Sequence, residues 1–274
     1  FSDYARNWAT NKIIIDSNGL NYQSKDDTWT VEYSTDGLSL AITYMDATQG
    51  WIPTTDDDVT DAPSKGNSEG IFGFGCCPLT AVTNLVSNTG VVSTDVTGVG
   101  TARHCRGATQ YGGDKGIFGF GSTGSGTAVT NLVSNAGVVG TDVTGVGTAR
   151  WYHTACSYGG DKGIFGFGFT GSYTAVTNLV SNTGVVATDV TGVGTARDQL
   201  ASCEYGTDTA IFGFGYDGSN TAVTNLVSNT GVVATDVTGV GTVRREIAAC
   251  SYGYDKGIFG YGSDDDDDDV TAVT

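Results

Sequence analysis

Short runs of apolar, β-branched and small residues, separated by turn-forming residues, recur through most of this chain. The segment 175–181 reads Ala-Val-Thr-Asn-Leu-Val-Ser, and 185–190 reads Val-Val-Ala-Thr-Asp-Val. Alternation over such lengths, rich in Val and Thr, predicts β-strands. The Asn-Thr-Gly between them and the Gly-Gly-Asp-Lys at 159–162 predict tight hairpin turns. With a small-residue strand ending at Tyr158 and a glycine-rich strand at 163–168, one unit predicts four short strands.

This unit is copied along the chain almost letter for letter. Its most constant part, Ile-Phe-Gly-Phe-Gly, begins at Ile71, Ile117, Ile164 and Ile211, in steps of 46, 47 and 47 residues. A fifth copy begins 47 residues later at Ile258, with Tyr261 in place of the second Phe. Four-stranded units repeating at this period predict the blades of a β-propeller. A further copy of the third strand begins at Val270, so we expect at least five blades when the ring is complete, and a chain that is a piece of a longer polypeptide.

The repeats resemble kelch repeats over residues 66–274. The signature here is Ala-Arg followed by Tyr-Gly-Gly-Asp-Lys-Gly-Ile-Phe-Gly-Phe-Gly. Two features depart from the kelch pattern: the Gly-Gly doublet appears as Gly-x-Gly, and the fourth-strand Trp is missing. The resemblance implies an all-β fold, with a kelch-like propeller of four-stranded blades in residues 63–274.

The first part of the chain, residues 1–62, differs from the repeats. Leu38, Leu40, Ile42 and Tyr44 alternate with other residues and predict a half-buried strand, and 54–68 has the composition of a linker. The tract Asp-Ala-Thr-Gln-Gly-Trp at 46–51 resembles β-rich modules that precede variable distal domains in structural proteins of tailed phages.

That second resemblance implies a non-enzymatic, fibre-type appendage of a virion. It would be a homo-oligomer, with a trimer favoured, that contacts other virion proteins and a host surface glycan or protein, or simply decorates the particle. An extracellular or cell-surface adhesin that binds glycans is the first alternative, and a propeller glycan hydrolase is the second.

Composition narrows the partners further. The 274 residues carry a formal net charge of −17, whereas nucleic acid and anionic membrane surfaces require clustered Lys and Arg. The apolar runs are too short to span a bilayer. Neither nucleic acid nor a membrane is expected as a partner.

Charged residues recur in phase with the repeat. The arginines are Arg103, Arg150, Arg197 and Arg244, and an aspartate precedes each by eight residues: Asp95, Asp142, Asp189 and Asp236. Propeller sialidases use converging arginines to clamp a carboxylate, but the sialidase box Ser-x-Asp-x-Gly-x-Thr-Trp is absent. Since an unpaired buried charge is costly, structural Arg–Asp pairing is favoured.

The copies differ mainly in two windows. One follows the in-phase Arg (104–106, 151–153, 198–200, 245–247), and the other follows Gly-Phe-Gly (76–78, 122–124, 169–171, 216–218). Positions that vary on a constant structural frame can determine what a protein binds. The candidate binding residues are the aromatics in or beside these windows: Trp151, Tyr152, Phe169, Tyr173 and Tyr216. The alternative is ordinary edge packing.

Metal and catalytic motifs are few. Cys156, Cys203 and Cys250 share one phase and are expected to be small buried hydrophobes, and the vicinal Cys76-Cys77 is poorly arranged for chelation. No metal site, catalytic residue or cofactor is expected, apart from loose Ca²⁺ binding as an alternative to a solvated loop at Asp264–Asp269. The acids of the first turn are expected to be structural: Asp114, Asp161, Asp208 and Asp255.

Overall fold

A computed structural model of the chain describes residues 1–26, 28, 31–57, 69–253 and 255–264. Every regular element in these ranges is a β-strand, which confirms the predicted all-β class. The chain forms two compact units, Phe1–Lys65 and Gly66–Thr274. The predicted boundary at 62–63 falls outside the described residues.

The N-terminal unit contains two antiparallel pairs. β1 (Ile13–Ile15) pairs with β2 (Val31–Tyr33), and β3 (Ser39–Asp46) pairs with β4 (Gly50–Asp57). The predicted alternating strand corresponds to β3, in which Leu40 is buried. Near it, the carboxylate of Asp3 accepts hydrogen bonds from the backbone N–H groups of Trp8 and Gly37, both at 3.0 Å.

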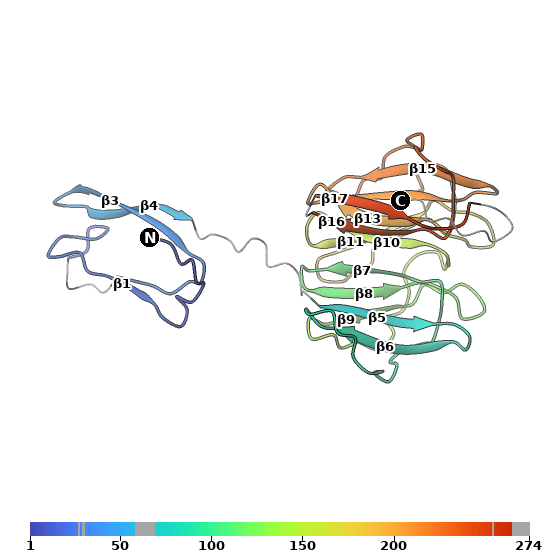
Figure 1. Ribbon diagram of the computed structural model, residues 1–274, viewed down its shortest axis with the longest axis horizontal. Helices are drawn as coiled ribbons and strands as arrows, with labels where there is room; N and C mark the ends of the chain where they lie inside the picture. Colours follow the sequence, from blue (N-terminus) through green and yellow to red (C-terminus); the bar gives the residue numbers. More distant parts are fainter. Residues whose placement is uncertain (27, 29–30, 58–68, 254, 265–274) are drawn as a thin grey trace. The chain divides into compact units, whose positions relative to one another are not determined.

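The second unit is a succession of five antiparallel sheets, one for each copy of the repeat (Figure 1). The outer sheets in the sequence are the pairs β5 (Gly70–Gly75) with β6 (Thr80–Val86), and β16 (Ala248–Tyr252) with β17 (Lys256–Gly260). The three sheets between them have three strands each: β7 (Gly107–Tyr111), β8 (Lys115–Gly119) and β9 (Thr130–Val133); β10 (Thr154–Tyr158), β11 (Lys162–Gly166) and β12 (Thr177–Val180); β13 (Ala201–Tyr205), β14 (Thr209–Tyr216) and β15 (Asn220–Val227). We call the first strand of a sheet (β7, β10, β13 or β16) its lead strand.

The predicted fourth strand of each unit is not a continuous strand. In the second copy, isolated bridges join Thr130 to Val143 and Val133 to Val139, and the backbone between them is irregular. The reason is a side chain inserted into the ladder, because Asn131 Nδ2 donates to Gly140 O (3.1 Å) and to Asp142 Oδ1 (2.9 Å). The three middle sheets are therefore three-stranded, and isolated bridges attach an extended segment to each of them.

Glycine and phenylalanine of the pentapeptide interlock successive sheets. A Cβ on Gly119 would lie 2.5 Å from the ring of Phe165, and one on Gly166 would lie 2.7 Å from the ring of Phe212. These rings are fully buried, so the repeated Gly provides the recess into which the Phe of the following sheet packs.

No closed ring of sheets is seen in the described residues, where β5–β6 and β16–β17 are the first and last sheets in sequence order. Phe72 is accordingly 63 % exposed, although its equivalents Phe118, Phe165 and Phe212 are buried.

Candidate functional site

The in-phase arginines lie inside the repeat array. The guanidinium carbons of Arg103, Arg150, Arg197 and Arg244 lie 4.4, 4.1, 4.3 and 4.7 Å from the ring centroid of a Phe in the preceding copy. Those phenylalanines have left-handed backbones; φ is 63° at Phe74 and 56° at Phe120. Burial lowers the pKa of Arg103, Arg150 and Arg197 to about 10, so each remains charged at neutral pH. They are structural residues of the inter-sheet contact.

Three of the in-phase arginines do not pair with the aspartates that precede them by eight residues. Against the lowering by burial, the charge of Asp142, which lies 39 residues after Arg103, raises the pKa of Arg103 and so stabilises its charged form. The preceding acid, Asp95, is not the source of this effect. The carboxylate of Asp142 itself accepts from Thr101 N (3.0 Å) and from Asn131 Nδ2 (2.9 Å). Arg150 with Asp189 and Arg197 with Asp236 repeat this relation. Pairing with the preceding acid was the wrong prediction for these three, because the fold brings Arg103, Arg150 and Arg197 to the acids of their own sheets.

The two variable windows lie next to each other. In the second to fifth copies an isolated bridge joins the first position of each window or its equivalent: His104 to Ser122, Trp151 to Phe169, Asp198 to Tyr216, and Arg245 to Ser263. Varied residues that are far apart in sequence therefore form one surface.

Four of the five candidate aromatics on that surface touch in series. Ring centroids lie 5.4 Å apart for Trp151–Phe169, 5.5 Å for Phe169–Tyr173 and 5.9 Å for Tyr173–Tyr216, all edge to face. The guanidinium of Arg245 lies 4.8 Å from the Tyr216 centroid and extends the series into the next copy. We call Trp151, Phe169, Tyr173 and Tyr216 the aromatic ladder. Each of its rings is half-buried, so part of each remains open to solvent.

Tyr152, the fifth candidate, belongs to a separate row. Cys105, Tyr152, Gln199 and Glu246 occupy one phase, and each has a left-handed backbone with φ of 52–54°. The N–H of Tyr152 donates to Cys105 O, that of Gln199 to Tyr152 O, and that of Glu246 to Gln199 O. We call these four residues the left-handed row. Tyr152 is 39 % exposed on it.

Asp198 lies beside both groups and was not among the predicted site residues. It is only 4 % exposed, and its Oδ1 has no hydrogen-bond partner. Burial raises its pKa to about 6, a shift that the charge of Glu246 increases and that of Arg245 reduces. Asp198 and Glu246 are acids at positions where the other copies carry other residue types. That departure from the repeat is the signal by which they could have been found.

The remaining candidates are structural. Asp114 and Asp161 bond to the following lysines, and their second oxygens accept from Asn135 and Asn182 of the later turn. His153 is buried, its Nε2 accepts from Gly107 N at 2.8 Å, and burial holds its pKa well below the usual value, so it is neutral.

The cysteines divide by exposure. Cys156 and Cys203 are buried as predicted, but Cys250 is exposed because no sixth sheet covers β16 in the described residues. No cluster of three or more His, Cys, Asp or Glu able to hold a metal occurs in the described ranges. Asp265–Asp269 of the acidic run lie outside them. Among the described residues no helix is long and apolar enough to cross a membrane.

Comparison with family models and with curated proteins finds no match to this chain. The kelch and phage resemblances therefore rest on the residues quoted for them, and the site is interpreted from its own chemistry.

Proposed function

We propose that this protein is a non-enzymatic glycan-binding β-propeller, whose repeats form a frame and whose variable windows form the binding surface. The observation that carries this proposal is the aromatic ladder. Residues at non-constant positions of neighbouring copies touch in series and keep part of each ring accessible. Rigid half-exposed aromatic rings provide large contact areas at low entropic cost and suit the apolar faces of sugar rings.

Polar groups beside the ladder are suited to sugar hydroxyls. Asp198 Oδ1 and Gln199 Oε1 are buried acceptors without a partner, which a ligand hydroxyl would reach only when the side chains that cover them move. The guanidinium of Arg245 lies over the ring of Tyr216. A buried acceptor without a partner costs free energy that a ligand hydroxyl would recover. Aromatic area with a few oriented polar groups is the usual composition of a small-ligand site.

Two observations support a propeller over a straight stack of sheets. The lead strands β7, β10, β13 and β16 each pack beside the next. The pKa of the Cys105 thiol is raised by burial and, in addition, by the charge of Glu246 three copies away. Successive residues of the left-handed row are joined by backbone hydrogen bonds, so in a straight row at about 4.8 Å per step Cys105 and Glu246 would be about 14 Å apart, beyond the Debye length of about 8–10 Å. Spin labels at positions 105 and 246, with the other cysteines replaced, should be closer together than in that straight row.

The binding proposal is tested on a glycan array with the full chain and two variants. Phe169→Ser and Tyr216→Ser place in the ladder the residue that two other copies carry there, Ser122 and Ser263, so the frame should tolerate them. We expect the wild type to bind a defined set of oligosaccharides and each variant to bind at least about tenfold more weakly, which is ~1.4 kcal/mol. Tyr252→Ser, an exposed aromatic outside the ladder, is the matched control and should bind like the wild type. Absence of binding, or equal binding by all four proteins, would overturn the proposal.

The biological setting we propose is a virion appendage, on the resemblance of residues 46–51 to tailed-phage modules. In that setting the protein would be a homo-oligomer, trimeric by preference, that displays the ladder toward a host surface glycan. Cryo-electron microscopy of the source particles, with an antibody against the repeats, tests it. Label on a capsid or tail projection supports the virion, whereas label confined to a cell surface supports the adhesin alternative.

A glycan hydrolase is the second candidate, favoured by Asp198 and Glu246. Glycosidases use two carboxyl groups, of which one is protonated near neutral pH. Asp198 and Glu246 are two carboxyl groups close enough for the charge of Glu246 to raise the pKa of Asp198. That pKa, about 6, lies near neutral pH, as the proton-donating carboxyl group of a glycosidase requires. Release of reducing ends from a bound glycan, lost in both Asp198→Asn and Glu246→Gln, would establish hydrolysis. Binding without release would leave the lectin-like function.

A further inference from the structure

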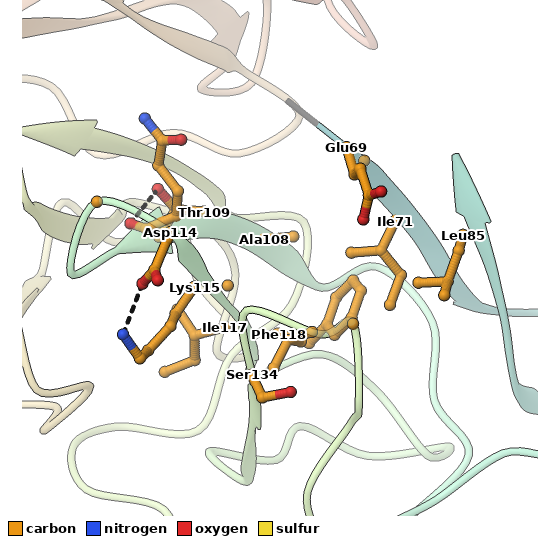
Figure 2. A pocket seen from close by; sticks show the side chains of 16 residues that line it. Glu69, Ile71, Leu85, Ala108, Thr109, Asp114, Lys115, Ile117, Phe118 and Ser134 are labelled. Atoms are coloured by element: carbon orange, nitrogen blue, oxygen red, sulfur yellow. Dashed lines mark hydrogen bonds and ion pairs between the residues drawn. The ribbon is translucent and has the colours of Figure 1, made fainter. Parts of the chain in front are cut away.

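Three of the six cysteines gather where the first two copies of the repeat meet. Cys76 and Cys77 lie in the turn between β5 and β6, and Cys105 lies two residues before β7. The two segments are joined by a hydrogen bond from Gly75 N to Arg103 O, at 3.3 Å. The cavity of about 230 Å³ between these sheets is lined, in the described part of the chain, by other residues, none of them a cysteine (Figure 2). The thiols are therefore a separate feature, distinct from the cavity and from the aromatic ladder.

The neighbouring pair is a departure from the repeat. At the positions of Cys76 and Cys77 the later copies have Ser-Thr at 122–123, Phe-Thr at 169–170, Tyr-Asp at 216–217 and Ser-Asp at 263–264. The frame therefore does not need sulfur there. The pair stands in the second variable window of the first copy, where side chains can serve a purpose other than packing.

The sulfur atoms of the pair are in contact. Cys77 Sγ donates a hydrogen bond to Cys76 Sγ, with 3.2 Å between the two atoms, and both side chains are exposed among the described residues. The contact joins two described side chains, so it does not depend on what lies beside the turn. That hydrogen bond and the charge of Cys77 raise the pKa of the Cys76 thiol. Because two adjacent thiolates repel each other, the pair releases its protons one at a time and presents a single thiolate beside a thiol.

A disulfide between neighbouring residues is easily broken. Cα atoms joined by a trans peptide are about 3.8 Å apart, whereas most disulfides join Cα atoms about 4.4–6.8 Å apart. Closing such a bond therefore strains the turn that contains it. Strained, exposed disulfides are reduced more readily than the structural disulfides of a core, and they are typical of reversible thiol chemistry.

The third thiol is a poorer reaction partner. Cys105 is half-buried, and its Sγ lies 2.9 Å from His104 Nδ1. Its pKa is raised by burial and, to a smaller extent, by the charge of Cys76, against a lowering by its hydrogen bond to Tyr152. Since the thiolate is the reactive form, an exposed thiol already in contact with Cys76 reacts before a half-buried one.

We propose that Cys76 and Cys77 form a reversible dithiol–disulfide site that exchanges with low-molecular-weight disulfides such as glutathione disulfide. In the first step, a thiolate of the pair attacks one sulfur of the small disulfide, forms a mixed disulfide and releases one small thiolate, which takes up a proton. In the second step, the other thiol of the pair loses its proton and attacks the protein sulfur of the mixed disulfide, which releases the second small thiol. The two cysteines lose two hydrogens and two electrons, and the small disulfide gains them.

The test is mass spectrometry of the full chain after incubation with glutathione disulfide, acid quenching, alkylation of the remaining thiols and digestion with trypsin. Tryptic peptide 66–103 contains Cys76 and Cys77 and no other cysteine, and Cys105 falls in the next peptide, 104–106. We expect peptide 66–103 to lose two hydrogens and to regain them with dithiothreitol. The internal disulfide should be at least about tenfold more abundant than the glutathione adduct, because the second thiol is held at a high effective concentration.

Cys76→Ser is the matched control, because the second and fifth copies have Ser at that position, Ser122 and Ser263. It leaves Cys77 without a neighbouring thiol, so its peptide should carry one glutathione instead of an internal bond. Three results would overturn the proposal: an unmodified wild-type peptide 66–103, a wild-type peptide that carries glutathione without an internal bond, or a bond between peptides 66–103 and 104–106. The last would assign the exchange to Cys105.

Discussion

Asp198→Asn is the substitution whose effect on stability can be worked out most fully from the structure. The carboxyl group is almost completely buried, one of its oxygens lacks a hydrogen-bond partner, and its pKa is raised from 3.8 to about 6. An acid with a raised pKa binds a proton more tightly in the folded than in the unfolded chain. Stability is therefore highest where both states are protonated, and it falls as pH rises through the window from about 4 to about 6.

The size of the effect follows from the shift. A change of about 2 pKa units, at ~1.4 kcal/mol per unit, makes the folded state about 3 kcal/mol less stable at pH 7 than it would be with a neutral group. Asparagine has nearly the same shape and no charge. We expect the variant to be about 1–3 kcal/mol more stable than the wild type at pH 7, and the difference to shrink toward zero by about pH 3.

Urea unfolding followed by circular dichroism at intervals from pH 3 to pH 8 measures this difference. Glu246→Gln removes a neighbouring acid that is exposed, and should change the unfolding midpoint little. Parallel pH curves for wild type and Asp198→Asn, or a variant that is less stable at pH 7, would refute the reasoning. Either result would mean that the carboxylate is well paired in solution.

Three further predictions concern the frame. Gly166→Ala should destabilise the protein by about 1–3 kcal/mol in urea unfolding, because its Cβ would overlap a buried phenyl ring, whereas Gly140→Ala should be neutral. Arg197→Lys should cost about 2–4 kcal/mol in the same assay, since one ammonium cannot replace guanidinium bonds to two carbonyls and an amide oxygen; an unchanged midpoint would contradict this. In the native protein, iodoacetamide should label the exposed Cys250 long before Cys156, whose pKa burial raises to about 12, and mass spectrometry of the labelled chain would reveal the opposite order.

The regular part of the fold was predictable because it depends on local patterns. The strands, their hairpin turns and the sheet-by-sheet order follow from alternation and from the turn residues of each copy. The fourth strand failed because the Asn131 side chain occupies the place of a ladder bond, and strand propensity does not register such an insertion.

The site was only partly predictable, for a different reason. The aromatics were identifiable as varied positions on a constant frame, but their contact in series depends on which windows the fold makes adjacent. The partner of Arg103 was mispredicted because the acid nearest in sequence belongs to the preceding sheet. Asp198 is a single acid in a chain rich in acids, and only its burial sets it apart.

The most direct test of the account is calorimetric titration of the full chain and of Tyr216→Ser with the oligosaccharide that binds best on the array. The account predicts saturable binding by the wild type and a dissociation constant at least about tenfold higher for the variant, with an unchanged unfolding midpoint. Equal affinities, with the ladder residue replaced and the fold intact, would show that the aromatic ladder is packing and not a binding surface.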